Sequence, residues 1–114
     1  MFNIVTNEAD RADAVLVRAV EPLGGLDIMQ NRRKVQTNNR NLTGGPGRVA
    51  QALAIGMEHN GISLDSPPIQ VLDDGFSLTA SQIATGPRIG MNFPGPDAVL
   101  PWRYWIAGNP WVSR

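Results

Sequence analysis

The fold is decided by residues 14–26, which read AVLVRAVEPLGGL. The first part of this stretch, 14–20, is apolar and rich in valine, with Arg18 as its single charge, and this composition predicts a strand. We expect the strand to end at Pro22, which has no backbone N–H, and at the glycine pair that follows, which permits a turn. The stretch therefore predicts a strand, a sharp break and the start of a helix.

Two helices are predicted beyond this break. The first covers residues 26–34, where Leu26 and Met29 share one face and basic residues fill the last turn, as the negative end of the helix dipole favours. A polar loop is expected over residues 35–43. The second helix is expected to open at the glycine pair before Pro46, because proline is favoured near a helix start, and to run to about residue 55.

The rest of the chain predicts short strands separated by turns. These strands are expected at 1–6, 69–72, 82–85, 88–91 and 102–107. Strands mixed with two short helices predict an α+β fold with a mostly antiparallel sheet. The chain has no internal repeat and no recognisable linker, so residues 1–114 are predicted to form a single domain.

The composition argues against several classes of chemistry. The chain has no cysteine and a single histidine, His59, so we expect no metal, no cofactor and no Ser-His or Cys-His triad. The acidic pair Asp73 and Asp74 precedes Gly75 and is typical of a hairpin turn. No apolar run approaches the roughly 20 residues of a membrane helix, and the first residues do not resemble a signal peptide, so we expect no membrane partner.

Charge is unevenly distributed, although ten basic and ten acidic residues balance overall. Residues 28–57 carry five basic residues and no acidic one, whereas residues 58–97 carry five acidic residues and one basic. The five residues of this basic sector are Arg32, Arg33, Lys34, Arg40 and Arg48. A local positive field can attract a polyanion even to a neutral protein. The alternative interpretation is an ordinary solvated surface.

Two features could hold an anion. The segment GGPGR at 44–48 lacks the Walker spacing but places backbone N–H groups and an arginine at a helix start, which is a generic anion site. The alternative is a plain glycine-rich start of a helix. Arg18, inside an apolar strand, must reach water or find a partner, because an unpaired buried charge is costly. Its guanidinium either faces a groove that receives phosphate or extends to the rim of the sheet.

Aromatic residues gather near the end of the chain. Residues 102–114 contain Trp102, Tyr104, Trp105 and Trp111 beside Arg103. Aromatic rings beside arginine can stack on nucleic-acid bases, although such rings more often belong to a core.

Three stretches carry motifs in a constant order. They are residues 14–26, residues 45–55 (GPGRVAQALAI) and residues 101–113 (PWRYWIAGNPWVS), and the GPRIG segment at 86–90 also matches in place. Together they resemble the alkyladenine (3-methyladenine) DNA glycosylase family, whose corresponding segments are LLRALEP…GL, GP.KL.QALAI and P.RFY..G.PWVS. Order and spacing hold from Phe2 to Ser113, so the resemblance covers nearly the whole chain.

The resemblance implies base-excision DNA repair, with double-stranded DNA that contains a damaged purine as the partner. Members of the family flip the damaged nucleotide out of the duplex and hydrolyse its N-glycosidic bond, which releases 3-methyladenine, 7-methylguanine, hypoxanthine or ethenoadenine. The resemblance also implies a curved, partly open barrel-like sheet, similar to the C-terminal domain of formyltransferases. It further implies a monomer without a cofactor, located in the bacterial cytoplasm with the nucleoid.

Five residues match functional positions of the family. The resemblance assigns Asn3 to the base pocket, where its side chain meets the edge of the flipped purine. Arg18 matches the strand arginine beside the phosphate of the reacting nucleotide. Gly47 and Arg48 stand at the start of the second helix, a position of phosphate contact, and Asn109 lies in the loop near the flipped sugar.

The chain departs from the family at its N-terminal side. The resemblance places the glutamate that activates water before residue 1, together with the stacking aromatics and the tyrosine that wedges into the duplex. No catalytic residue is therefore assigned within the chain, which we interpret as N-terminally truncated and expect to be inactive alone. The alternative function is a non-catalytic nucleic-acid-binding module that uses the basic sector.

Overall fold

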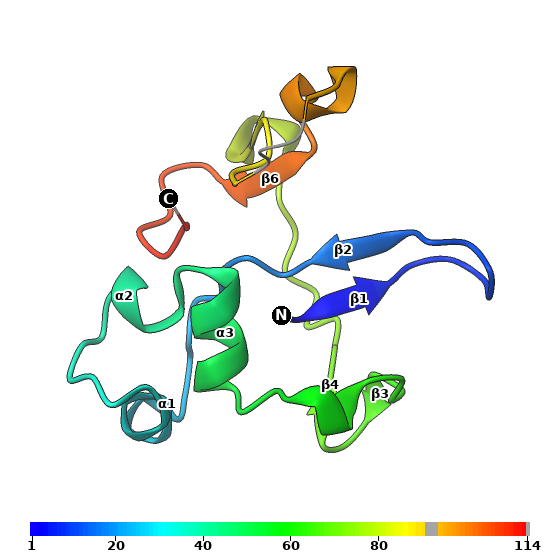
Figure 1. The fold of residues 1–114 in the computed structure, drawn as a ribbon. Helices are drawn as coiled ribbons and strands as arrows, with labels where there is room; N and C mark the ends of the chain where they lie inside the picture. The colour runs from blue at the N-terminus through cyan, green and yellow to red at the C-terminus, as the bar shows by residue number, and fades with distance from the viewer. Residues whose placement is uncertain (91–93, 114) are drawn as a thin grey trace. The chain divides into compact units, whose positions relative to one another are not determined.

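The computed structural model describes residues 1–90 and 94–113, and contacts between residues divide the chain into two compact units. The first unit comprises Met1–Asn60 together with Pro110–Arg114, and the second comprises Gly61–Asn109. The first unit contains a β-hairpin and all three α-helices, and the second contains two further strand pairs (Figure 1).

The hairpin of the first unit pairs β1 (Asn3–Val5) with β2 (Ala14–Leu16) in antiparallel register. Asn3 lies opposite Leu16, and the Val17 N–H still donates to the Phe2 carbonyl oxygen at 3.0 Å. Beyond that point the chain finds a different partner, because Ala19 forms an isolated antiparallel bridge with Gly44. The strand predicted over 14–20 is therefore correct in position but too long, since its second half leaves β1.

Helix α1 (Leu26–Arg33) confirms the first predicted helix almost residue for residue. The residue before it, Gly25, has a φ of 69°, and the helix ends at Lys34 with a φ of 54°. Both angles lie in the left-handed region: at Lys34 this conformation commonly ends a helix, and at Gly25 glycine permits the turn that precedes α1. The turn expected at the glycine pair is therefore the device that starts α1.

The polar loop predicted over 35–43 is wrong at its end, where the chain forms α2 (Arg40–Thr43), so residues 1–90 and 94–113 contain three α-helices instead of two. The side-chain oxygen of Asn39 caps α2 by accepting a hydrogen bond from the Asn41 N–H at 2.9 Å. A four-residue helix is too short to form a visible apolar pattern. Its stability must come from the cap and from tertiary contacts.

Helix α3 (Pro46–Ala52) starts where the sequence predicted and stops three residues earlier than expected. The Ile55 N–H donates to the Ala50 carbonyl oxygen at 2.8 Å, and Ala54 has a φ of 55°. This bond pattern, with a left-handed residue after the helix, is the Schellman motif that closes many helices. Alanine occupies the position that glycine usually takes, so the sequence did not reveal the stop.

The core of the first unit lies where α2 packs on α3, and α1 contacts both helices. Three apolar side chains are completely buried there, namely Leu42, Val49 and Ala52. The polar side chain of Thr43 is buried with them, and its hydroxyl donates to the Val20 carbonyl oxygen at 2.7 Å. This bond joins the end of α2 to the segment that follows β2.

The second unit contains two antiparallel pairs, β3 (Asp65–Ser66) with β4 (Ile69–Gln70) and β5 (Ile83–Gly86) with β6 (Arg103–Ile106). These pairs correspond to three of the predicted strands. The strand predicted over 88–91 is absent from its described residues, because Ile89 and Gly90 form a turn in which Gly90 has a φ of 78°. Met91 lies outside the described residues.

All strand pairs in the described part of the chain are antiparallel, and each is a separate two-stranded sheet. Single turns of 3₁₀ helix occur at Met57–His59, Ala80–Gln82 and Pro96–Val99. Within residues 1–90 and 94–113, no helix has the length and apolar character that a membrane span requires. The barrel-like sheet expected from the family resemblance stays a prediction.

Candidate nucleic-acid interface

The two features singled out as anion sites are neighbours along the backbone of the first unit. The bridge between Ala19 and Gly44 is antiparallel, so Arg18 follows β2 beside the point where Gly45 leads into α3. Arg18 is half-buried and its Nε atom is fully shielded from solvent. The structure therefore brings the backbone of the strand arginine beside the start of α3, while the shared phosphate site stays a prediction.

The backbone is tightly packed where Ala19 pairs with Gly44, a place that we call the Gly44 crossing. The Gly44 N–H donates to the Arg40 carbonyl oxygen at 2.6 Å, and Gly44 is itself buried. A Cβ atom added at Gly44 would overlap that carbonyl oxygen and would lie 3.1 Å from the Arg40 carbonyl carbon. At Gly47 an added Cβ would meet nothing within 4 Å. Glycine is thus required by close approach at position 44, but not by packing at position 47.

Arg33 makes three side-chain hydrogen bonds in this region. Its Nε donates to the Leu42 carbonyl oxygen at 3.1 Å, and its two terminal nitrogens donate to the Asn41 carbonyl oxygen at 2.7 Å and to Gln51 Oε1 at 2.9 Å. The guanidinium therefore reaches from the end of α1 to the last turn of α2 and to α3. Helix ends leave such carbonyl groups without partners, and Arg33 satisfies two of them.

Arg32 has a similar but smaller role. One of its terminal nitrogens donates to the Ala52 carbonyl oxygen, the last residue of α3, at 3.0 Å. Two members of the basic sector are thus engaged with backbone carbonyls at helix ends. The sequence contained only a weak signal of this, because arginine in the last turn of α1 indicated a dipole effect within that helix and no tertiary contact.

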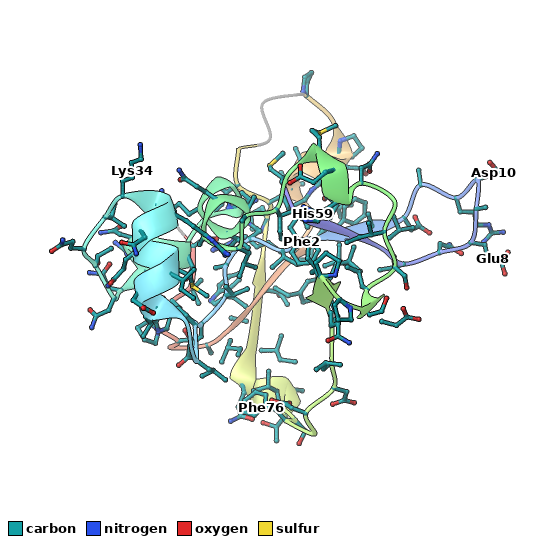
Figure 2. All side chains as sticks on the ribbon, turned by 90° about the horizontal axis from the view of Figure 1, so that it is seen from below. Phe2, Glu8, Asp10, Lys34, His59 and Phe76 are labelled. Atoms are coloured by element: carbon teal, nitrogen blue, oxygen red, sulfur yellow. The ribbon has the colours of Figure 1, made fainter. Side chains whose placement is uncertain are left out.

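The remaining members of the basic sector are more available to a ligand. Arg48 is exposed in the first turn of α3, and its closest hydrogen-bonding atom is Asn41 Oδ1 at the long distance of 3.4 Å. Lys34 points away from the helices (Figure 2). Among the described residues, neither Lys34 nor Arg40 has a side-chain hydrogen bond or an ion pair. Lys34 and Arg40 can therefore meet phosphate without losing a hydrogen bond, and Arg48 would lose only its long contact with Asn41.

Asn3 lies in β1, and its side chain is exposed. The register places it opposite Leu16, two residues before Arg18 along the neighbouring segment. Asn3, Arg18, Gly47 and Arg48 thus all belong to the first unit, whereas Asn109 is the last residue of the second unit. Asn109 is half-buried, and its N–H donates to the Ile106 carbonyl oxygen at 3.2 Å.

The aromatic residues at positions 102, 104 and 105 divide into two groups. The Trp105 ring packs against Gly86, where an added Cβ would lie 3.2 Å from the ring, and the Arg103 guanidinium sits 4.3 Å from its centroid. Tyr104 is 67% exposed and Trp102 is 51% exposed. One ring therefore supports the strand pair, as the core interpretation predicts, while two remain accessible for stacking.

A second cation–π contact lies in the same unit. The Arg88 guanidinium is 5.4 Å from the centroid of the Trp102 ring, and its Nε is shielded from solvent without a hydrogen bond among the described residues. No group of three or more metal-ligating side chains is found in residues 1–90 and 94–113. The side chains described above offer cation and amide contacts with an anion, together with exposed aromatic rings for stacking.

Comparison with known proteins identifies the relatives of the chain. Residues 1–110 match the methylpurine-DNA glycosylase family. A protein of Rhodopseudomonas palustris and one of Nitrosospira multiformis, both assigned as 3-methyladenine DNA glycosylases, are each 45% identical to the chain over 113 residues, which is 99% of its length. A protein of Bacillus licheniformis with the same assignment is 41% identical over all 114 residues.

The alignments cover almost all of this chain but only part of each relative. The aligned region is 53% of the Rhodopseudomonas protein, 55% of the Nitrosospira protein and 56% of the Bacillus protein. The chain spans about half the length of the curated relatives it matches. The matched residues 1–110 include the stretches at 14–26 and 45–55 and most of the stretch at 101–113. Because the family match covers nearly the whole chain, the chain belongs to the methylpurine-DNA glycosylase family.

Proposed function

We propose that the chain acts in base-excision repair as the DNA-contacting part of a methylpurine-DNA glycosylase. The observation that carries this proposal is the bridge between Ala19 and Gly44, because it sets Arg18 beside the start of α3, where Arg48 is exposed. In this proposal an arginine from each of these two adjacent segments contacts one or two consecutive phosphates.

The chemical problem of such an enzyme explains why these cations matter. The N-glycosidic bond lies inside the base stack, so the damaged nucleotide must be extruded, and unstacking costs a few kcal/mol. Phosphate contacts on either side of the lesion can offset this cost by holding the distorted backbone. In this proposal Arg18, Gly47 and Arg48 hold phosphate, Asn3 meets the edge of the extruded purine, and Asn109 lies near the sugar.

The proposal separates binding from hydrolysis. By the family resemblance, the glutamate that activates water corresponds to no residue of 1–114. We therefore expect the 114-residue chain to bind duplex DNA weakly and to release no base. Incubation with a duplex containing ethenoadenine, followed by strand scission at abasic sites, tests this. Robust turnover would contradict the proposal, because a residue within 1–114 would then have to act as the general base.

The binding part of the proposal is tested by the salt dependence of duplex affinity. Each phosphate contact contributes about 0.9 to the slope of log K against log salt, so Arg48→Gln should flatten the slope by about that amount. Arg11→Gln is the matched control, because Arg11 is an exposed arginine in the loop between β1 and β2. Equal slopes for the two variants, or no duplex binding by the parent chain, would contradict the proposal.

The alternative of a binding module that uses the whole basic sector has less support. Arg32 and Arg33 are occupied by Ala52, Leu42 and Gln51, so they do not present free donors to phosphate. The proposal therefore relies on a smaller set of contacts, in which Arg48 is the exposed arginine.

A further inference from the structure

We infer that Arg33 is a positioning residue for the phosphate contact: it fixes the last turn of α2, and through Asn41 and the Gly44 crossing it sets the place of Arg48. The inference rests on the proposed function, because it concerns how the same phosphate site is built. Arg33 itself is not expected to touch DNA in this arrangement.

The contacts of Arg33 link three helices through one planar group. Two bonds go to consecutive carbonyl oxygens, those of Asn41 at 2.7 Å and Leu42 at 3.1 Å, and the third goes to Gln51 Oε1 at 2.9 Å. The guanidinium donates from a rigid fork, so a single side chain can satisfy acceptors on two helices at once. A lysine keeps the charge but donates from one point, and cannot span all three acceptors.

We call the three hydrogen bonds of Arg33 the Arg33 clamp. Asn41 connects this clamp to Arg48. Its backbone oxygen accepts from Arg33, while its side-chain Oδ1 lies 3.4 Å from a terminal nitrogen of Arg48. Movement of the α2 backbone would therefore move the amide that faces Arg48. That amide is the only described hydrogen-bonding partner of the Arg48 guanidinium among residues 1–90 and 94–113.

The crossing of the chain gives a second route of coupling. Two residues after Leu42, Gly44 packs on the Arg40 carbonyl and bridges Ala19, the neighbour of Arg18. Because the Gly44 N–H bonds to the Arg40 carbonyl oxygen while Gly44 bridges Ala19, a shift of the last turn of α2 would also move the residue that pairs with Ala19. Arg33 thus stabilises the geometry that brings Arg18 and the start of α3 together.

The test compares Arg33→Lys with Arg32→Lys in the 114-residue chain. Both changes keep the charge, but Arg32 makes a single bond, to the Ala52 carbonyl oxygen, which a lysine can also make. Arg33→Lys should weaken binding to an undamaged duplex about tenfold, the factor expected from loss of one charge-assisted contact, and should flatten the salt slope by about 0.9. Arg32→Lys should leave both within about twofold.

A double-mutant cycle separates positioning from a general loss of structure. In an Arg48→Gln background, Arg33→Lys should cause no further loss of affinity, because the contact that Arg33 positions is already gone. Additive losses, or an unchanged salt slope for Arg33→Lys, would overturn the inference. If Arg33→Lys fails to fold, Gln51→Leu removes one acceptor and keeps both carbonyl bonds, and should give a smaller loss of the same kind.

An NMR measurement without DNA keeps this inference distinct from the proposed function. The backbone amide resonances of Gly44, Gly45 and Gly47 should shift, and exchange faster with solvent, in Arg33→Lys than in Arg32→Lys. Unchanged glycine resonances would overturn the inference even if the duplex is bound. Shifted resonances in a chain that binds no duplex would contradict the proposed function and leave the clamp intact.

Discussion

Replacing Gly44 with alanine tests the backbone crossing on which the candidate interface depends. The added Cβ would overlap the Arg40 carbonyl oxygen, which also accepts the Gly44 N–H at 2.6 Å. Overpacking costs about 1–3 kcal/mol, and loss of the hydrogen bond adds about 1 kcal/mol. The contact is with backbone rather than with a side chain that could rotate away. We therefore expect Gly44→Ala to lower the free energy of unfolding by about 2–4 kcal/mol.

The matched control is Gly47→Ala, three positions further along the same glycine-rich segment. Gly47 lies in α3, and an added Cβ there meets nothing within 4 Å. Alanine is the better helix former, so this change should raise stability by up to about 1 kcal/mol. The two substitutions have the same chemistry and should act in opposite directions.

Urea unfolding followed by circular dichroism measures both changes. With a slope near 1.5 kcal/mol per molar urea, the Gly44→Ala midpoint should fall by about 2 M, while the Gly47→Ala midpoint should stay or rise slightly. A Gly44→Ala variant within about 0.5 kcal/mol of the parent chain would refute the reasoning. In that case the turn from α2 into the Ala19 bridge would not have the close packing described above.

Three further changes test the small core beside this crossing. Leu42→Ala removes a completely buried side chain and should cost about 2–5 kcal/mol by urea unfolding, whereas Leu23→Ala, at a position 90% exposed, should change stability by less than about 0.5 kcal/mol. Thr43→Val keeps the volume but leaves the Val20 carbonyl oxygen without its hydroxyl donor, so we expect a loss of about 1–3 kcal/mol. Asn39→Ala removes the cap of α2 and should cost about 1 kcal/mol, visible as faster amide exchange in that helix.

Local signals in the sequence predicted the helices better than the strands. Helix α1 was foreseen because its start and its basic last turn lie within a few residues of each other, and α3 because proline marks its beginning. The strand over 14–20 was predicted too long, since its pairing depends on where β1 and the Gly44 segment lie. Composition records a preference for extended backbone, but it does not record the partner that completes the ladder.

The elements that escaped prediction are those stabilised from outside. Helix α2 has four residues, and the contacts that complete its end come from Arg33 on another helix. The stop of α3 uses Ala54 in a left-handed conformation that alanine rarely adopts. The strand predicted at 88–91 gave way to a turn at Gly90. For α2 a tertiary contact outweighed the local preference, whereas at Gly90 the positive φ that glycine permits ended the expected strand.

The candidate site was predicted in part. Arg18 and the GGPGR segment were singled out for unrelated reasons, one as a charge in an apolar strand and the other as a helix start rich in glycine. The structure places them side by side through the Ala19 bridge, although their contacts with DNA stay predictions. Arg33 was expected to contribute charge to a DNA surface, and its role in holding α2 could not be seen without the fold.

The count of charges in the basic sector therefore overstates the contacts it can make with DNA. All five cations contribute to the field that attracts a duplex, because hydrogen bonds to neutral carbonyls do not remove charge. Contact with phosphate is more demanding, since a guanidinium already committed to helix ends would have to break those bonds first. Five contacts would give a salt slope of about −4.5, whereas the three uncommitted cations of the sector give about −2.7. Net charge therefore combines two different quantities. Long-range attraction depends on all five basic residues of the sector, whereas the release of counterions depends only on the groups that can contact the DNA backbone.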